Sequence, residues 1–152
     1  MPSIQYEAIY KRALTRMDDL NLASYDEEDF YTYMREWLHT TVSSPLLRKK
    51  FSSFSLNDEL MKLDFTLSYS VDDDYDKEFV TSLLAKGVIV NYMPSRIDSD
   101  KNLAVMVGSD KEKKIIGNYS KNIERLNELK REWERDLTRH TYYFCEYGVS
   151  NG

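Results

Sequence analysis

Apolar residues recur every three or four positions at the start of the chain, the spacing that places side chains along one face of a helix. This pattern predicts a first helix over residues 4–20 and a second helix that begins after Asp26. Asp26 is a candidate capping residue, because an aspartate carboxylate can accept hydrogen bonds from the unpaired amides of a first helical turn. Pro45 disfavours helical geometry in the residue before it, so the second helix should end near residues 43–44. We expect the two helices to pair antiparallel.

Residues 63–71 instead alternate between apolar and polar side chains, the period of two that marks a half-buried strand. A strand needs a hydrogen-bonded neighbour, because unpaired backbone groups at a sheet edge invite other chains to pair. Three partners are open at this point: residues 51–56, the aromatic C-terminal tail, and a strand of a neighbouring subunit. The pattern therefore predicts a small β element and leaves its partner undecided.

Several aspartates follow that strand, between Asp72 and Asp76, and favour the start of a third helix, because carboxylates stabilise the positive helix N-terminus. The run from Phe79 to Met93 is apolar almost all round, which is typical of a helix at the centre of a core. Pro94 should end this helix. A brief turn should then precede Gly108, carrying Leu103, Val105 and Met106.

A capping-box sequence, Ser109 to Glu112, introduces the last predicted helix, because its serine and glutamate side chains satisfy two free amides. Helical spacing over residues 110–139 predicts a strut about 45 Å long. The predicted fold class is mainly α: a helical bundle with a long C-terminal helix and a small β element near residues 63–71. We interpret residues 1–140 as one helical domain and the aromatic tail, residues 141–152, as a candidate docking element.

Composition and charge narrow the function. The chain has 152 residues, enough for one compact core, and its scarcity of glycine (5) and proline (3) favours helices over many strands. A net charge of -5 argues against a protein that grips a phosphate backbone, since such binding depends on clustered cations. An acidic surface suits a conduit through which DNA slides, because like charge repels phosphate. With no leader-like N-terminus and no apolar run near ~18 residues, we expect no membrane anchor.

Side chains that usually carry catalysis or bind metals are scarce. Cys145 is the only cysteine, and the two histidines, His39 and His140, have no second ligand at metal-binding spacing. The Asp72–Asp76 run lacks the central glycine and the terminal glutamate of a calcium-binding loop, and no glycine-rich phosphate loop is present. We therefore expect no enzyme activity, no cofactor and no metal, and a single cysteine suits a reducing compartment.

Two segments carry side chains that are common in contact surfaces: the basic and aromatic residues 48–54, and the aromatic tail at residues 142–147. Aromatic side chains anchor many interfaces, and an extended segment can add a strand to a partner's sheet. Residues 48–54 could instead be an exposed connector without a partner, and the tail could fold back onto the sheet of its own domain. Nucleic-acid contact is the less favoured interpretation of three cations. The candidate partner-binding residues are Arg48, Lys49, Lys50, Phe51, Phe54, Tyr142, Tyr143, Phe144 and Tyr147.

The order of features from Val71 to Leu129 carries a family resemblance. An acidic turn is followed by the segment from Val88 to Ile97, then by Gly108 to Lys111 and the leucine-rich strut. In this order the chain resembles small virion proteins of tailed phages, the head-tail connectors, also described as head completion or neck adaptor proteins. Where family members tend to have Glu-Trp-Leu before the proline, this chain has Asn91-Tyr92-Met93.

The resemblance implies a structural virion protein that forms a homo-oligomeric, dodecameric ring between the portal protein and the next neck protein, either a stopper or a tail terminator. DNA would pass through the lumen without sequence-specific binding. The protein would be located in the virion neck, and in the host cytoplasm during assembly.

Three other functions stay open. A tail terminator or another neck protein would normally carry more sheet than the pattern predicts. A phage-encoded regulator that binds a host protein also suits a small, acidic, helical domain. An enzyme would need an active centre built from Asp, Glu, Tyr and Lys, and is the least favoured.

Overall fold

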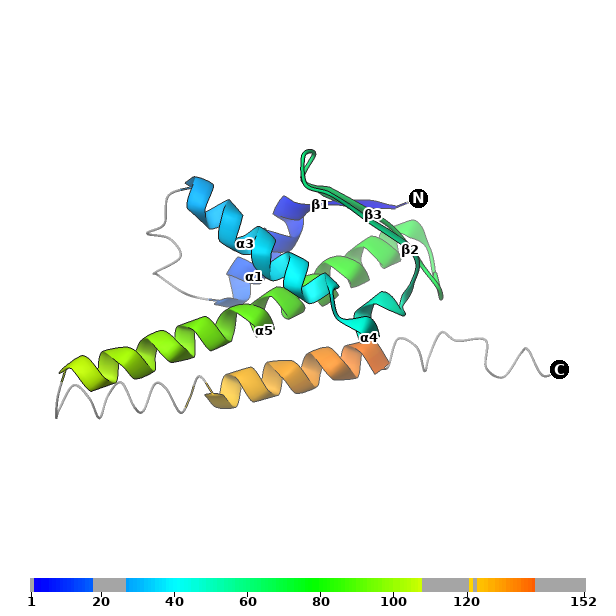
Figure 1. Cartoon of the computed structure of the whole chain (residues 1–152). Coiled ribbons are helices and arrows are strands. Elements are labelled where there is room, and N and C mark those ends of the chain that lie inside the picture. Colours follow the sequence, from blue (N-terminus) through cyan, green and yellow to red (C-terminus); the bar gives the residue numbers. More distant parts are fainter. Residues whose placement is uncertain (1, 18–26, 108–120, 122, 139–152) are drawn as a thin grey trace.

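The computed structural model describes residues 2–17, 27–107, 121 and 123–138. The elements follow in the order β1 (Ser3–Gln5), α1 (Tyr6–Met17), α3 (Glu27–Val42), α4 (Pro45–Arg48), β2 (Phe51–Asn57), β3 (Lys62–Leu67) and α5 (Asp73–Val107). Residues 123–138 are also helical. Figure 1 shows the helices filling most of the molecule, with the small sheet on one side of α5. The predicted fold class, mainly α with a small β element, is confirmed.

The predicted strand is β3, and it lies at the centre of an antiparallel sheet of order β1-β3-β2. Its first neighbour, β2, comes from one of the three partner segments left open by the sequence. The strand ends at Leu67 rather than near residue 71. Beyond Leu67 the chain turns toward α5, where Asp76 accepts hydrogen bonds from the Ser70 hydroxyl (2.5 Å) and the Val71 amide (3.1 Å). Those contacts draw the end of the expected strand away from the sheet.

The start of the chain differs from the expected helix over residues 4–20. Residues 3–5 form β1, the second neighbour of β3, and the helix begins at Tyr6. The Phe65 amide donates to the Pro2 carbonyl (3.0 Å) and the Tyr6 amide donates to the Met61 carbonyl (2.8 Å). The sheet thus satisfies backbone groups that would otherwise be free at the helix N-terminus. The spacing of Ile4 and Tyr6 fits either a strand or a helix, and the pairing of residues 3–5 with β3 selects the strand.

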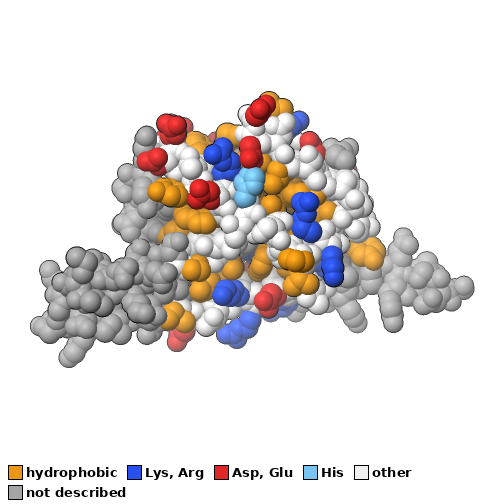
Figure 2. Space-filling view, viewed as in Figure 1, with side chains coloured by type: hydrophobic (Ala, Val, Ile, Leu, Met, Phe, Trp, Pro, Cys, Tyr) orange, Lys and Arg blue, Asp and Glu red, His pale blue; other side chains and the backbone are white. Residues whose placement is uncertain are grey.

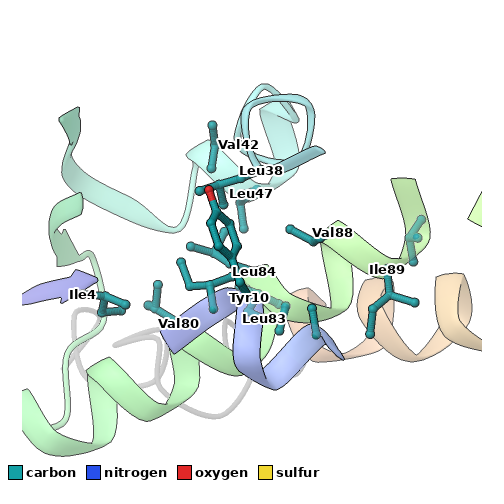
Figure 3. Packing of buried hydrophobic residues seen from close by; sticks show 14 of the residues in the cluster. Ile4, Tyr10, Leu38, Val42, Leu47, Val80, Leu83, Leu84, Val88 and Ile89 are labelled. Carbon is teal, nitrogen blue, oxygen red and sulfur yellow. The ribbon is translucent and has the colours of Figure 1, made fainter. Parts of the chain in front are cut away.

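The second helix, α3, ends at Val42 as predicted, while its expected cap, Asp26, lies outside the described residues. Both α1 and α3 pack mainly on α5, although the rings of Tyr10 and Tyr31 also bring them into contact (6.1 Å between centroids). Figure 3 shows buried side chains from β1, α1, α3, α4 and α5 converging in one cluster. We conclude that α5 is the central element of the core, as its apolar sequence predicts.

The prediction that Pro94 ends the third helix is wrong. Helix α5 continues through Pro94 to Val107, so the expected turn carrying Leu103, Val105 and Met106 lies within it. Proline removes one backbone hydrogen bond from a helix, at a cost of about 3 kcal/mol. The residues before Pro94 are extensively buried, and Pro94 itself is exposed, so the helix loses this bond without losing its packing. Its 35 residues correspond to a length of about 50 Å.

The predicted helix over residues 110–139 is described at residue 121 and over 123–138, and these residues are helical. Figure 1 shows this segment running alongside α5. The Trp133 indole donates to the Leu83 carbonyl (3.0 Å), and Lys86 forms an ion pair with Glu132 (2.9 Å). Residues 108–120, 122 and 139–152, which include the start of that predicted helix and the tail, lie outside the described residues.

Candidate functional site

The cations and aromatics predicted from the sequence meet where α4 leads into β2. We call Arg48, Lys49, Lys50, Phe51 and Phe54 the α4–β2 corner. Backbone hydrogen bonds shape it: the Lys49 amide donates to Pro45 (3.1 Å) and the Lys50 carbonyl accepts from Ser68 (2.9 Å). The chain therefore reverses within a few residues and enters the sheet with its polar groups paired.

The two phenylalanines of the corner have different positions. Phe51 is buried and packs edge-on against Phe65 of β3, with ring centroids 5.9 Å apart. Phe54 is half-buried, lies 4.8 Å from Phe51 between ring centroids, and carries the Arg48 guanidinium 4.6 Å above its ring. A cation over an aromatic face is attracted by the ring quadrupole, which holds Arg48 in place. Phe51 thus belongs to the core, and Phe54 forms the border between core and surface.

The cations of the corner also differ in exposure. Arg48 and Lys49 are exposed, whereas Lys50 is half-buried, and burial lowers the pKa of its ammonium group. Beside them, Leu46 is an exposed apolar side chain, with 61% of its surface accessible. The corner therefore presents two cations next to a leucine and a partly exposed aromatic ring, a mixture found in protein contact surfaces.

Figure 2 shows the face of the molecule seen in Figure 1, where Lys and Arg side chains are scattered among acidic and hydrophobic ones. No continuous basic band crosses the part of this face that the structure describes. Binding along a phosphate backbone depends on clustered cations, and the described part of this face does not cluster them.

A second polar cluster, not predicted from the sequence, joins Tyr6, His39 and Asp58. The buried Tyr6 hydroxyl donates to the Asp58 carboxylate (2.7 Å), and the His39 Nε2 lies 3.0 Å from both oxygens of that carboxylate. Asp58 stands in the β2–β3 turn, where Met61 adopts a left-handed backbone conformation (φ 51°). The cluster therefore ties α1 and α3 to the tip of the hairpin.

The electrostatics of this cluster favour a structural role. Burial, and then the hydrogen bond to Asp58, raise the pKa of Tyr6 far above its ordinary value. The same hydrogen bond is the main reason that the pKa of Asp58 lies below its ordinary value, with His39 contributing. Tyr6 is therefore held as a neutral donor and Asp58 as a charged acceptor at neutral pH. That pairing supplies a stable link between α1 and the turn of the hairpin.

A third set of charged residues fastens the 123–138 helix to the rest of the molecule. Lys86 of α5 contacts both Glu132 and Asp136, and Glu132 also lies 3.5 Å from Arg16 of α1. Lys86 is only 15% exposed, and its ammonium is the main cause of the lowered pKa of Glu132. These contacts join three helices, and we interpret them as part of the packing.

Within the described ranges, no group of three or more His, Cys, Asp or Glu side chains is arranged to hold a metal ion. Over the same part of the chain, no helix combines the length and apolar character needed to cross a membrane.

The sequence-predicted residues fall into two groups. Those from Arg48 to Phe54 are brought together at the corner, whereas Tyr142, Tyr143, Phe144 and Tyr147 lie outside the described residues. His39 lies in the last turn of α3, and its contact with Asp58 was not predicted. No local pattern links positions 6, 39 and 58, because only the folded chain brings them together. Comparisons with protein-family models, curated proteins and solved structures found no match to this chain.

Proposed function

We propose that this chain is a structural virion protein rather than an enzyme: a head-tail connector that forms a ring between the portal protein and the next neck protein. The observation that carries the proposal is the α4–β2 corner, where exposed cations and Leu46 adjoin the edge strand β2. Such a corner offers charge and apolar surface to one partner. The resemblance to connector proteins implies that this partner is the portal protein.

Two further properties support the connector. Helix α5 is about 50 Å long, which suits an element that spans between neighbouring proteins. The net charge of -5 suits a lumen that DNA crosses without being retained. In a ring, neighbouring copies meet head to tail through different surfaces, so the corner and the opposite side of the molecule would have different partners.

The first experiment mixes the purified chain with candidate portal rings and measures mass by light scattering, with mass spectrometry of intact particles as a companion. We expect stoichiometric capture into a ring of defined mass and detection of the chain in particles. A chain that ignores the portal and is missing from particles would instead support the host-binding regulator. A tail terminator would carry more sheet than the three strands described here.

Variants test which surface docks. We expect Arg48→Ala combined with Lys49→Ala to weaken capture by the portal roughly tenfold, as loss of interface anchors does. Lys121→Ala combined with Lys130→Ala is the matched control, because it removes two exposed cations outside the corner and should leave capture unchanged. Deleting residues 141–152 should leave the domain folded and abolish docking. Full docking by the corner variant and by the truncated chain would together exclude both predicted contact segments.

A further inference from the structure

Strand β2 lies at an edge of the described sheet, with β3 on one side and no described strand on the other. It has seven residues, whereas β1 at the opposite edge has three. An edge of this length presents a row of free backbone donors and acceptors, which is a template for another strand. Figure 1 shows β2 and β3 as the long hairpin of the fold.

The pairing pattern identifies which residues of β2 face outward. In an antiparallel sheet, the backbone groups of successive residues point alternately to the two neighbouring strands. The Phe65 amide is directed to β1, since it donates to Pro2 (3.0 Å). Asp64, one residue earlier, is therefore directed to β2, where it stands opposite Ser55. It follows that Phe54 and Leu56, the neighbours of Ser55, direct their N–H and C=O groups to the open edge.

The side chains at these positions continue the apolar face of the sheet. Phe54 stands opposite Phe65 and Leu56 stands opposite Leu63, both of which are fully buried. Residues directly opposite in a ladder lie on the same face, so Phe54 and Leu56 extend that face to the edge. Both are only half-buried. An added strand would cover them and continue the core.

The charges at the two ends of β2 have opposite signs. The cations Lys49 and Lys50 precede the strand, and the carboxylates Asp58 and Glu59 follow it. Lys49 and Glu59 are exposed, and neither has an ion-pair partner among the described residues. The pairing of β2 with β3 shifts between Phe51 and Ser53, Lys49 caps the end of helix α4, and Glu59 lies in the turn after the strand. The charges therefore mark the two ends of β2, and they complement each other end to end when a second copy is turned through a half rotation about Phe54.

We propose that the β2 edges of two copies of this chain pair antiparallel about Phe54, so that one sheet runs through both copies. In this arrangement the two Phe54 residues exchange backbone hydrogen bonds, and the end of β2 that carries Lys49 in each copy lies beside the end that carries Glu59 in the other. The contact is isologous, so it closes at a dimer and is separate from the head-to-tail contacts of a ring. It does not depend on the virion function proposed above.

Charge reversal tests this geometry. Sedimentation velocity over a concentration series should find a reversible dimer of the intact chain. Lys49→Glu alone and Glu59→Lys alone each place like charges together twice in the dimer, and each should raise the dissociation constant roughly tenfold at low salt. The double variant, Lys49→Glu with Glu59→Lys, restores opposite charges and should recover the dissociation constant of the unmodified chain.

Lys77→Glu is the matched control, because it makes the same charge change at an exposed lysine of α5 and should leave the dimer intact. Circular dichroism verifies that every variant keeps its helical fold. A chain that stays monomeric throughout the series, or a dimer whose dissociation constant is unchanged by both single reversals, would refute the pairing. So would a monomer that becomes a dimer only after residues 139–152 are deleted, because the tail would then be the occupant of the edge.

Portal capture and dimer formation can be separated with the same double variant, Lys49→Glu with Glu59→Lys. The double reversal should restore the dimer while leaving portal capture impaired, because capture is proposed to need the cation at Lys49 itself.

Discussion

Gly87 of α5 lies against Thr41 of α3 so closely that a Cβ atom at position 87 would overlap the Thr41 Cγ2 and approach Trp133 Cζ2 to 3.2 Å. Thr41 cannot easily turn away, because its hydroxyl donates to the Trp37 carbonyl (2.8 Å) and accepts from the Asn91 amide (2.9 Å). Glycine is normally unfavourable inside a helix. Here it is required, because two helices and the 123–138 segment meet at this point.

Gly87→Ala should therefore destabilise the protein, by about 1–3 kcal/mol, as overpacking of a core does. The sign is informative, since Ala for Gly in a free helix stabilises by about 1 kcal/mol. Urea unfolding followed by circular dichroism measures the change. Thr41→Ser keeps the hydroxyl and removes the overlapping methyl group, so adding it to Gly87→Ala should recover part of the loss. A stabilising Gly87→Ala substitution would contradict the close contact.

Asp58→Asn should make the free energy of unfolding less dependent on pH in the acidic range. The folded state lowers the pKa of Asp58, so its contribution is present above the ordinary Asp value of about 3.9 and is lost as pH falls through the lower, folded value. The unmodified chain should thus lose stability more steeply below about pH 4 than the variant does. Urea midpoints across pH 2–7 provide the comparison. Asp64→Asn, an aspartate without a resolved partner in the described structure, is the control and should keep the steep slope.

Tyr6 and Tyr10 should resist ionisation while the chain is folded. Both are buried, and burial raises the pKa of each far above its ordinary value. Their contribution to stability is present below the ordinary Tyr value of about 10 and is lost as pH rises above it. Absorbance of tyrosinate during an alkaline titration should show a late step that coincides with unfolding. Tyr6→Phe should diminish that late step, because the buried Tyr6 is one of its two contributors.

Lys86→Met should loosen the 123–138 helix, because Glu132 and Asp136 then face each other without their shared cation. We expect a loss of about 1–3 kcal/mol at neutral pH, between the values for surface and buried ion pairs. The ammonium of Lys86 lowers the pKa of Glu132, so the difference between variant and parent should shrink as pH falls and Glu132 is protonated. Adding Glu132→Gln to the variant should restore stability at neutral pH. A loss independent of pH would indicate packing alone.

Local patterns predicted several elements well. Pro45 indicated the end of α3, and the period of two indicated the strand β3. The aspartates indicated the start of α5. Each depends on residues close together in the chain. The basic and aromatic character of the α4–β2 corner was visible for the same reason.

Other features depended on distant residues. The pairing of residues 3–5 with β3 changed the start of the first helix, and the packing before Pro94 let α5 continue past a residue that usually ends helices. The link from Tyr6 to Asp58 and the contact of Gly87 with Thr41 also join segments far apart in sequence. By itself the sequence determined the mainly helical class, the central helix and the placement of charges, because these follow from neighbouring side chains. Only the tertiary structure decided which strands pair, which glycine is required and which strand lies at the edge of the described sheet, because those depend on which distant surfaces come into contact.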